Sequence, residues 1–319
     1  MASTFIKAAE VWIPSDDGML LEFGGGAFGA AKRFAAISRS MCFGRGEGLP
    51  GRAWEQGRPV LLRSFEGSYF RRTAAAQAAG LNCAIAIPMF PNERFGGVLV
   101  LYCSHAAAPK GALELWHHKH GVATDLKLLD GAYGSEAAAF ESISGQTSLP
   151  RGAGLPGLAW ERGATVFLED LTAKDKGFVR AEAAADARLQ RGLSLAIGAP
   201  LQDTYVVTIL TGLDGPLAKR VERWVPDQTH HRLSREFAFN EQDGRPTLLA
   251  AHLPLVRAPG DPAGSIERAW SSGIAVVSEH LDEEPGAPAV AANAIGACAL
   301  VAIPVIWDGE TVEVLALYV

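Results

Sequence analysis

Three histidines in the segment WHHKH are the residues best suited to metal chemistry. His117, His118 and His120 lie within four residues, and in a strand His118 and His120 would share a face that His117 does not. Together with His230 and His231 from a later connection, they could offer imidazole ligands to a metal ion or a haem iron. The segment favours the alternative of an exposed polar hairpin, and we assign no metal ligands.

Four cysteines, Cys42, Cys83, Cys103 and Cys298, are the candidates for thiol chemistry. None belongs to a CxxC pair, so the sequence predicts neither a disulfide framework nor a zinc knuckle. Cys83 falls in a continuous apolar run, where a thiol behaves as a small hydrophobic side chain and is inert. A thiol enzyme is therefore the weakest of the alternatives that we retain.

Signatures of other active sites are absent from the sequence. It has no Walker loop, no serine nucleophile elbow and no HExxH motif. The glycine-rich segment FGGGAFGA, from Phe23 to Ala30, has only a loose GxGxxG spacing and no βαβ context, and we interpret it as a flexible connection. We expect no catalytic residues and a non-enzymatic protein.

Composition narrows the class of protein further. The chain is 48% hydrophobic and 20% charged, and no apolar run reaches the roughly 18 residues that a membrane helix needs. It has 29 Lys and Arg against 35 Asp and Glu, with no long basic run, so nucleic acid is not an expected partner. No export signal is visible at the start, and we expect a cytoplasmic protein without a membrane partner.

A tryptophan motif occurs three times along the 319 residues. GLPGRAWEQG contains Trp54, GLPGLAWERG contains Trp160, and the more divergent GSIERAWSSG contains Trp270. Pro suits the first turn of a helix and Gly the position just past its end, so each motif predicts a short helix that lays its indole against a sheet.

The same series of elements is expected around each motif. A hairpin precedes it (EVWIP with MLLEF, ELWHH with DLKLLD, EFAFN with TLLAAHL), and an extended run follows it. Alanine-rich stretches then predict helices ending at Gly80, Gly192 and Gly296. Continuous apolar runs to Pro88, Pro200 and Pro304 predict buried strands, each followed by a turn and a last strand.

These repeats divide the chain into three domains, residues 1–105, 106–217 and 218–319. The connections are AAAPKG and LDGPLAKRVERWVPDQTHH. The first connection is too short to contain two long helices, so we expect the copies to pack directly on one another.

The order of hairpin, GLPGRAWEQG, strand, alanine-rich helix opened by Phe-Arg, GLNCAIAIP, turn and GVLVLYCS resembles the GAF domain, a small-molecule sensory module. The resemblance covers nearly all of the first copy, most of the second and, more weakly, the third. It implies an α+β fold of three tandem GAF-like domains, each a central antiparallel sheet flanked by short helices, with a degenerate third domain.

The resemblance also implies where a ligand would bind, since GAF ligands commonly lie between the sheet and the helices that cross it. The alternative is that the aromatic and thiol side chains are ordinary core and the arginines are solvated. The implied pocket residues are Trp54, Phe70, Arg71, Arg72 and Cys83 in the first copy, Trp160, Asp170, Phe178, Arg180 and Leu195 in the second, and Trp270, His280 and Cys298 in the third.

Two hypotheses of function follow. The first is a sensory or regulatory protein that binds a small molecule in one or more of these pockets and signals to a separate protein partner, because no kinase, cyclase or DNA-binding segment is recognised beside the three copies. The second is a protein-interaction scaffold whose pockets are filled by its own side chains. Both are compatible with a homodimer, and neither specifies the ligand or a cofactor.

Overall fold

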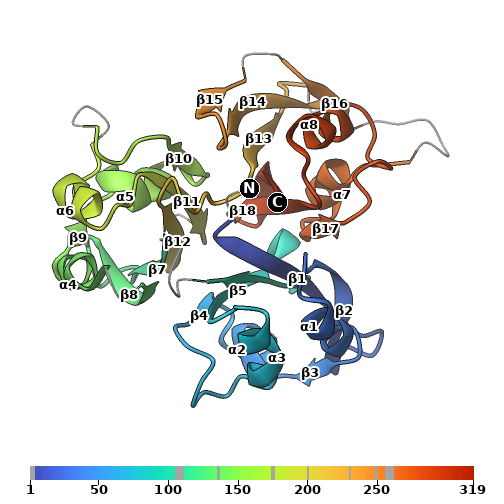
Figure 1. Ribbon diagram of the computed structural model, residues 1–319, viewed down its shortest axis with the longest axis horizontal. Coiled ribbons are helices and arrows are strands. Elements are labelled where there is room, and N and C mark those ends of the chain that lie inside the picture. The colour runs from blue at the N-terminus through green and yellow to red at the C-terminus, as the bar shows by residue number, and fades with distance from the viewer. Residues whose placement is uncertain are drawn as a thin grey trace.

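The computed structural model describes residues 4–104, 111–134, 137–173, 177–199, 201–229, 231–247, 250–255 and 262–319. Within these ranges the chain forms three antiparallel sheets, each with helices on one face, so the fold is α+β as the sequence predicts. We call the sheets and their helices the first module (6–103), the second module (111–211) and the third module (220–318). Figure 1 shows the three modules arranged around a common axis, with their sheets facing inward and their helices outside.

The elements of the first module follow the predicted order of hairpin, Trp helix, strand, helix, strand, turn and strand. They are β1 (Ile6–Pro14), β2 (Leu20–Ala27), α1 (Lys32–Ser38), β3 (Cys42–Gly44), α2 (Gly48–Gln56), β4 (Val60–Leu62), α3 (Thr73–Ala78), β5 (Cys83–Met89), the 3-10 helix η1 (Pro91–Glu93) and β6 (Gly97–Cys103).

The second and third modules repeat this order with small changes. The second contains β7 (Gly111–His118), β8 (Leu126–Tyr133), α4 (Ala138–Gln146), β9 (Ser148–Leu149), α5 (Gly154–Arg162), β10 (Val166–Leu168), α6 (Ala181–Asp186), β11 (Arg191–Ile197) and β12 (Thr204–Thr211). The third contains β13 (Arg220–Pro226), β14 (Arg232–Asn240), β15 (Arg245–Pro246), β16 (His252–Pro254), α7 (Ser265–Ser272), β17 (Val276–Ser278), α8 (Ala287–Ile295), β18 (Leu300–Trp307) and β19 (Glu310–Tyr318).

All three sheets have the same strand order. It is β3-β2-β1-β6-β5-β4 in the first, β9-β8-β7-β12-β11-β10 in the second and β15-β14-β13-β19-β18-β17 in the third, where β16 also pairs with β14. The internal repeat seen in the sequence is therefore a repeat of one topology.

The first strand of the third module lies where the sequence predicts a connection. The segment RVERWVP forms β13, which pairs with β14 on one side and β19 on the other. EFAFN belongs to β14, the second strand of the hairpin, and does not open it. This prediction was wrong because three of the seven residues of β13 are charged, and the buried Arg220 and Glu222, which pair within the module, made a central strand resemble a polar link.

The helix of the second module ends earlier than Gly192. Helix α6 ends at Asp186, and Gly192 lies inside β11. Gly80 and Gly296 hold the left-handed positions after α3 and α8, with φ of 70° and 60°. In the second module Arg188 takes that conformation (φ 54°) without being glycine, so the glycine signal pointed four residues too far.

Most of the glycine-rich segment, Phe23 to Ala27, belongs to a strand and is not a flexible connection. Gly24, Gly25 and Gly26 lie in β2, opposite the irregular step between Val11 and Trp12 of β1. A Cβ on Gly26 would lie 2.8 Å from the carbonyl oxygen of Ala9. The glycines thus permit a close approach of backbones in the sheet.

The modules form a closed ring through their short strands. β4 of the first module packs beside β8 of the second, and β17 of the third beside β2 of the first. In the remaining seam Phe167 of β10 contacts Phe237 and Phe239 of β14, with ring centroids 5.4 Å and 5.3 Å apart. Each module uses the same edge against the same strand of its neighbour, as in a head-to-tail cyclic trimer.

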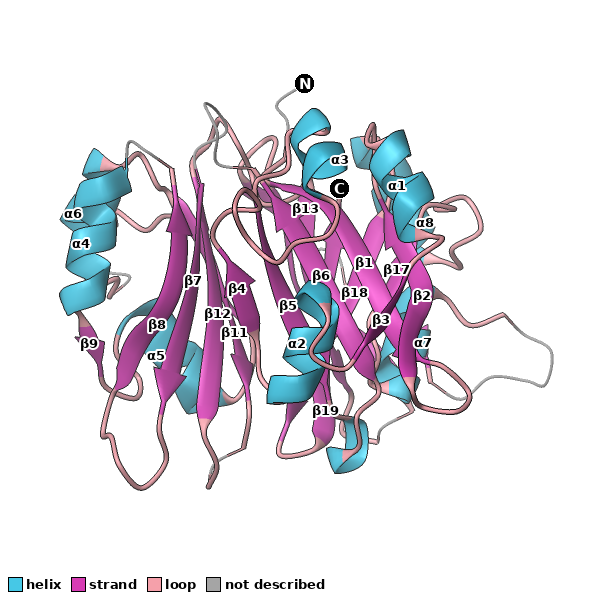
Figure 2. Ribbon diagram, turned by 90° about the horizontal axis from the view of Figure 1, so that it is seen from below, coloured by secondary structure: helices cyan, strands magenta, loops and turns pink. Residues whose placement is uncertain are grey.

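Two kinds of hydrophobic core result. One axial core is shared by the three sheets and contains residues such as Ile85, Leu193 and Val301. On the other face of each sheet a separate core lies under the helices of that module. Figure 2 shows the sheets side by side with helices on their outer faces. In the described residues no helix is long and apolar enough to cross a membrane.

Candidate ligand-binding site

The three tryptophan motifs form the short helices that the sequence predicts. Helices α2, α5 and α7 each end on a left-handed glycine, Gly57, Gly163 or Gly273, with φ of 61°, 59° and 63°. Each helix contacts the last two long strands of its own sheet. The three indoles therefore occupy equivalent places under the helices.

The surroundings of the indoles differ in detail. Trp54 stacks on Phe95 at 5.3 Å between ring centroids, and Trp160 lies 4.3 Å from the ring of His118. Trp160 is buried, whereas Trp54 and Trp270 are partly exposed. All three belong to the helix-side cores of their modules, so core packing accounts for them.

A buried carboxylate occupies the place under the helices of the first module. Glu10 of β1 accepts hydrogen bonds from Trp12 Nε1 (3.0 Å) and from the Tyr102 hydroxyl (2.7 Å). Arg72, at the start of α3, donates to both carboxylate oxygens at 2.6 Å and 3.0 Å and also to Ser38 of α1. The side chains of Arg72 and Glu10 are 2% and 0% exposed, so a buried ion pair fills this space.

The second module repeats this ion pair. Glu114 accepts from Trp116 Nε1 and from the Tyr133 hydroxyl, both at 2.9 Å. Arg180 donates to Glu114 Oε2 at 2.9 Å and also to Ser144. Burial alone would raise the pKa of Glu114, but the Arg180 guanidinium and the three hydrogen-bond donors hold that pKa below its ordinary value.

The third module keeps the carboxylate but changes the source of its cations. Glu222 accepts from Trp224 Nε1 and the Tyr318 hydroxyl, both at 2.9 Å. Its guanidinium partners are Arg220 of β13 at 2.7 Å and Arg235 of β14 at 2.9 Å. The arginines come from the sheet because Gly286 stands before α8, where Arg72 and Arg180 stand before α3 and α6.

The sequence contains a signal for this network that lies outside the tryptophan motifs. Each of these carboxylates opens a Glu-x-Trp triplet in the first strand of its module: Glu10 to Trp12, Glu114 to Trp116 and Glu222 to Trp224. In a strand the two side chains share a face, so the carboxylate can accept from its own tryptophan. The triplet is a better marker of the third copy than its eroded tryptophan helix.

The implied pocket residues divide between the two faces of the sheets. Trp54, Phe70 and Arg72 lie together under the helices of the first module, and Trp160, Phe178 and Arg180 do so in the second. Trp270 lies in the corresponding core of the third module.

The remaining implied residues lie elsewhere. Cys83 and Leu195 point into the axial core on the opposite face of their sheets, and burial raises the pKa of the Cys83 thiol. Arg71 is exposed and pairs with Glu47 at 3.0 Å. Asp170 is exposed and accepts a hydrogen bond from Thr172. His280 and Cys298 are also exposed, so the structure does not gather all the implied residues of a module into one pocket.

His117 and His118 of WHHKH have different partners, while the ring centroids of His118 and His120 lie 6.4 Å apart. His117 Nε2 lies 3.0 Å from Asp203 Oδ2, while His118 Nε2 lies 2.8 Å from the Ala123 carbonyl oxygen. Of the two later histidines, His230 lies outside the described residues. Among the described residues no three His, Cys, Asp or Glu side chains come together as a metal site.

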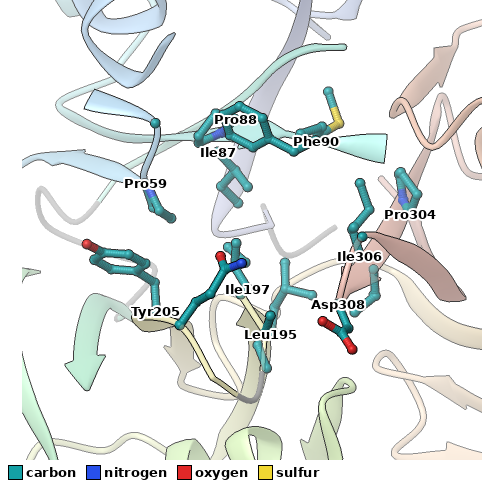
Figure 3. A pocket seen from close by; sticks show the side chains of 18 of the residues that line it. Pro59, Ile87, Pro88, Phe90, Leu195, Ile197, Tyr205, Pro304, Ile306 and Asp308 are labelled. Carbon is teal, nitrogen blue, oxygen red and sulfur yellow. The ribbon is translucent and has the colours of Figure 1, made fainter. Parts of the chain in front are cut away.

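A cavity of about 500 Å³ lies between the modules, at one end of the axial core (Figure 3). Ile87, Leu195 and Ile303 line it from β5, β11 and β18. They are equivalent positions in the three sheets. In each module the residue just before them (Ala86, Ser194 or Ala302) pairs with the first valine of the adjacent short strand, β4, β10 or β17. The next positions, Pro88, Ala196 and Pro304, followed by Met89, Ile197 and Val305, also line it.

The turns after these strands form the rim of the cavity. Asn92 N donates to the Gly309 carbonyl at 2.8 Å, and Asp308 N donates to the Gly198 carbonyl at 3.0 Å. These bonds join the turn of the third module to the turns of the other two. At the seam between the first and second modules, Pro59 and Tyr205 lie near each other at the edge of the cavity (Figure 3).

A second cavity, of about 730 Å³, lies on the seam between the first and third modules. Its lining includes Lys7, Lys219, Glu279 and Cys298. Neither cavity is lined by Arg71, Arg72 or Arg180, so the arginines of the implied pockets take no part in the open space.

Comparison with known proteins finds a family match in the N-terminal part of the chain. Residues 3–130, which cover the first module and reach into β8, match the family model described as the GAF domain. GAF domains are generally sensory or ligand-binding modules. No curated protein matches the sequence.

Several solved structures are similar over 31% of this chain. They include the A. aeolicus NLH2 GAF domain in an inactive state (17% identity, 58% of that chain, TM-score 0.26). A free methionine-R-sulfoxide reductase from Neisseria meningitidis in complex with its substrate is 16% identical over 52% of that chain, with a TM-score of 0.25. NreA from Staphylococcus aureus, mutated in its nitrate-binding site, is 14% identical over 73% of that chain, with a TM-score of 0.26. The chain thus spans little more than half the length of the first two.

Proposed function

We propose that this protein is a non-enzymatic, cytoplasmic regulator built of three GAF-like domains, residues 1–105, 106–217 and 218–319, that binds one small molecule in the axial cavity. Its output is an altered contact with a separate protein partner. The ligand site is thus between the domains and not within each of them.

The observation that carries the proposal is the lining of the axial cavity. Equivalent apolar residues of all three modules, Ile87, Leu195 and Ile303 among them, surround about 500 Å³, which is within the ordinary range of small-molecule pockets. Such pockets are commonly apolar and lie where domains meet. A ligand there would contact all three sheets at once.

This position gives a simple route to a response. A ligand that binds the closed ring more tightly than a loosened one shifts the population toward the closed ring, by no more than that difference in affinity. The seams are the elements that would respond, because backbone bonds between turns and side-chain contacts join the modules there, beside the shared axial core.

A protein-interaction scaffold is the second candidate. The buried Arg72–Glu10 and Arg180–Glu114 pairs fill the places where ligands lie in GAF domains, and they favour a role in which those faces are purely structural. The two candidates differ in whether the axial cavity takes a ligand.

Titration with N-phenyl-1-naphthylamine, an uncharged apolar fluorescent dye, tests the proposal. We expect one saturable site in the natural protein and at least a tenfold loss of affinity in Leu195→Trp, which fills the cavity. The control is Val290→Trp, which adds the same side chain at an exposed position (71%) of α8. Equal binding to all three proteins, or no saturable binding to the natural one, would favour the scaffold.

A further inference from the structure

The three turns at the rim of the axial cavity each contribute one carboxylate. Glu93 comes from η1 of the first module, Asp203 from the turn before β12 and Asp308 from the turn before β19. The described lining contains no Lys, Arg or His. Three acidic groups therefore surround an opening whose floor is apolar.

The backbone of the lining is also poorly suited to an anion. Anions in proteins are held by backbone N–H groups or by Arg and Lys side chains. Pro88 and Pro304 carry no N–H, and they occupy equivalent positions on two of the three walls. Phe90 and Tyr205, in contrast, present aromatic rings, whose faces attract cations.

Asp203 is held in its charged form. Burial of this carboxyl acts to raise its pKa, but hydrogen bonds from His117 and from the His120 backbone lower it below the ordinary value. Its side chain is 41% exposed, and its two oxygens contact the β7–β8 hairpin, Oδ2 at 3.0 Å from His117 Nε2 and Oδ1 accepting from the His120 N–H at 2.9 Å. Lys119 and Arg58 approach Asp203 and Tyr205 respectively without lining the cavity.

We infer that the ligand of the axial cavity is an amphiphile with an apolar body and a cationic or uncharged end, and that anionic amphiphiles are excluded. The apolar body would lie on Ile87, Leu195 and Ile303, and its polar end would lie among the rim carboxylates. This inference rests on the proposed function, since it names the chemistry of the ligand of that same site.

Three probes with the same eight-carbon chain separate the two claims: octylamine, octan-1-ol and octanoate, each measured at pH 7 and low salt by displacement of N-phenyl-1-naphthylamine. We expect octylamine to bind about tenfold more tightly than octanol, and octanoate at least tenfold more weakly. The advantage of the amine should shrink as salt rises, because the rim charges are exposed to solvent.

A pair of charge variants completes the test. Asp308→Asn keeps a residue type that tolerates the left-handed backbone there (φ 55°), and should reduce the amine advantage about threefold. The control Asp186→Asn changes an exposed acid of α6, at the far end of β11, and should leave it unchanged.

The outcomes distinguish the two claims. Equal affinities for the three probes, or tightest binding of octanoate, would overturn the charge preference while leaving the cavity as a ligand site. Failure of the dye and of all three probes to bind would overturn the proposed function itself.

Discussion

The two faces of each sheet treat polar groups in opposite ways. Under the helices a glutamate, an arginine, a tryptophan and a tyrosine are buried together and bond to one another. On the axial face the strands carry aliphatic side chains and leave open space between modules. A buried ion pair is tolerated only where most of its polar atoms have hydrogen-bond partners, so the side chains around it must pack closely. Aliphatic side chains need no such partners, and they can leave space where the three sheets converge. The space for a ligand is therefore at the junction of the repeats.

Removing one partner of a buried pair should have the largest effect. Arg72→Ala leaves the Glu10 carboxylate buried without its cation and should lower the free energy of unfolding of the first module by about 3–5 kcal/mol. Calorimetry, which can resolve modules that unfold separately, is the appropriate measurement. The double variant Arg72→Met with Glu10→Gln should recover part of the loss. A loss below about 1 kcal/mol in Arg72→Ala would mean that the pair is not what closes this face.

Adding volume to each face should separate the closed core from the open one. Leu210 of β12 is buried under the helices, and Leu210→Trp should cost about 1–3 kcal/mol because the core has no room for it. Leu195→Trp places the same side chain in the axial cavity and should cost less than about 1 kcal/mol. Urea unfolding of both variants gives the difference. Equal costs would show that the cavity is closed in solution.

Acidification should change stability in opposite directions at the seam and in the module interior, by less than the substitutions above. Burial raises the pKa of Glu313, which bridges the second and third modules by accepting from Thr165 N at 2.6 Å. Its folded state binds a proton more readily than the unfolded chain, so its contribution to stability rises as the pH falls from neutral toward about 4.5. Glu114, whose pKa is lowered, instead contributes stability that is lost as the pH falls below that range.

The melting temperature at pH 7 and pH 5 measures this contribution. In Glu313→Gln the neutral amide can still accept from Thr165, and the change with pH should be smaller than in the natural protein. An identical pH dependence in the two proteins would assign the effect to other groups, among them Glu241, whose pKa burial also raises.

The local elements could be predicted because residues such as Pro and Gly favour particular backbone conformations at helix ends. The helices around Trp54, Trp160 and Trp270 follow from Pro and Gly at fixed offsets, and those expectations are confirmed. The errors at β13 and Arg188 arose where tertiary pairing or backbone strain overrode the usual residue preferences.

The candidate site could not be predicted in the same way. Which face of β5 and β11 points toward the axis depends on how whole sheets pack together, and the sequence of one strand does not contain that information. The resemblance therefore implies the helix face for Cys83 and Leu195, whereas both lie in the axial core. Likewise Glu93, Asp203 and Asp308 line one cavity only because three turns, about a hundred residues apart in sequence, lie at the same end of the ring.

That ring has a consequence for where the chain can begin. Thr4 and Val319 both line the second cavity, so the two ends of the described chain lie at one seam, and Figure 1 shows them near the centre. No seam depends on which of the two connections between modules is cut. Joining the present ends and opening the connection between the first and second modules would give a circularly permuted protein with every module still beside its neighbours.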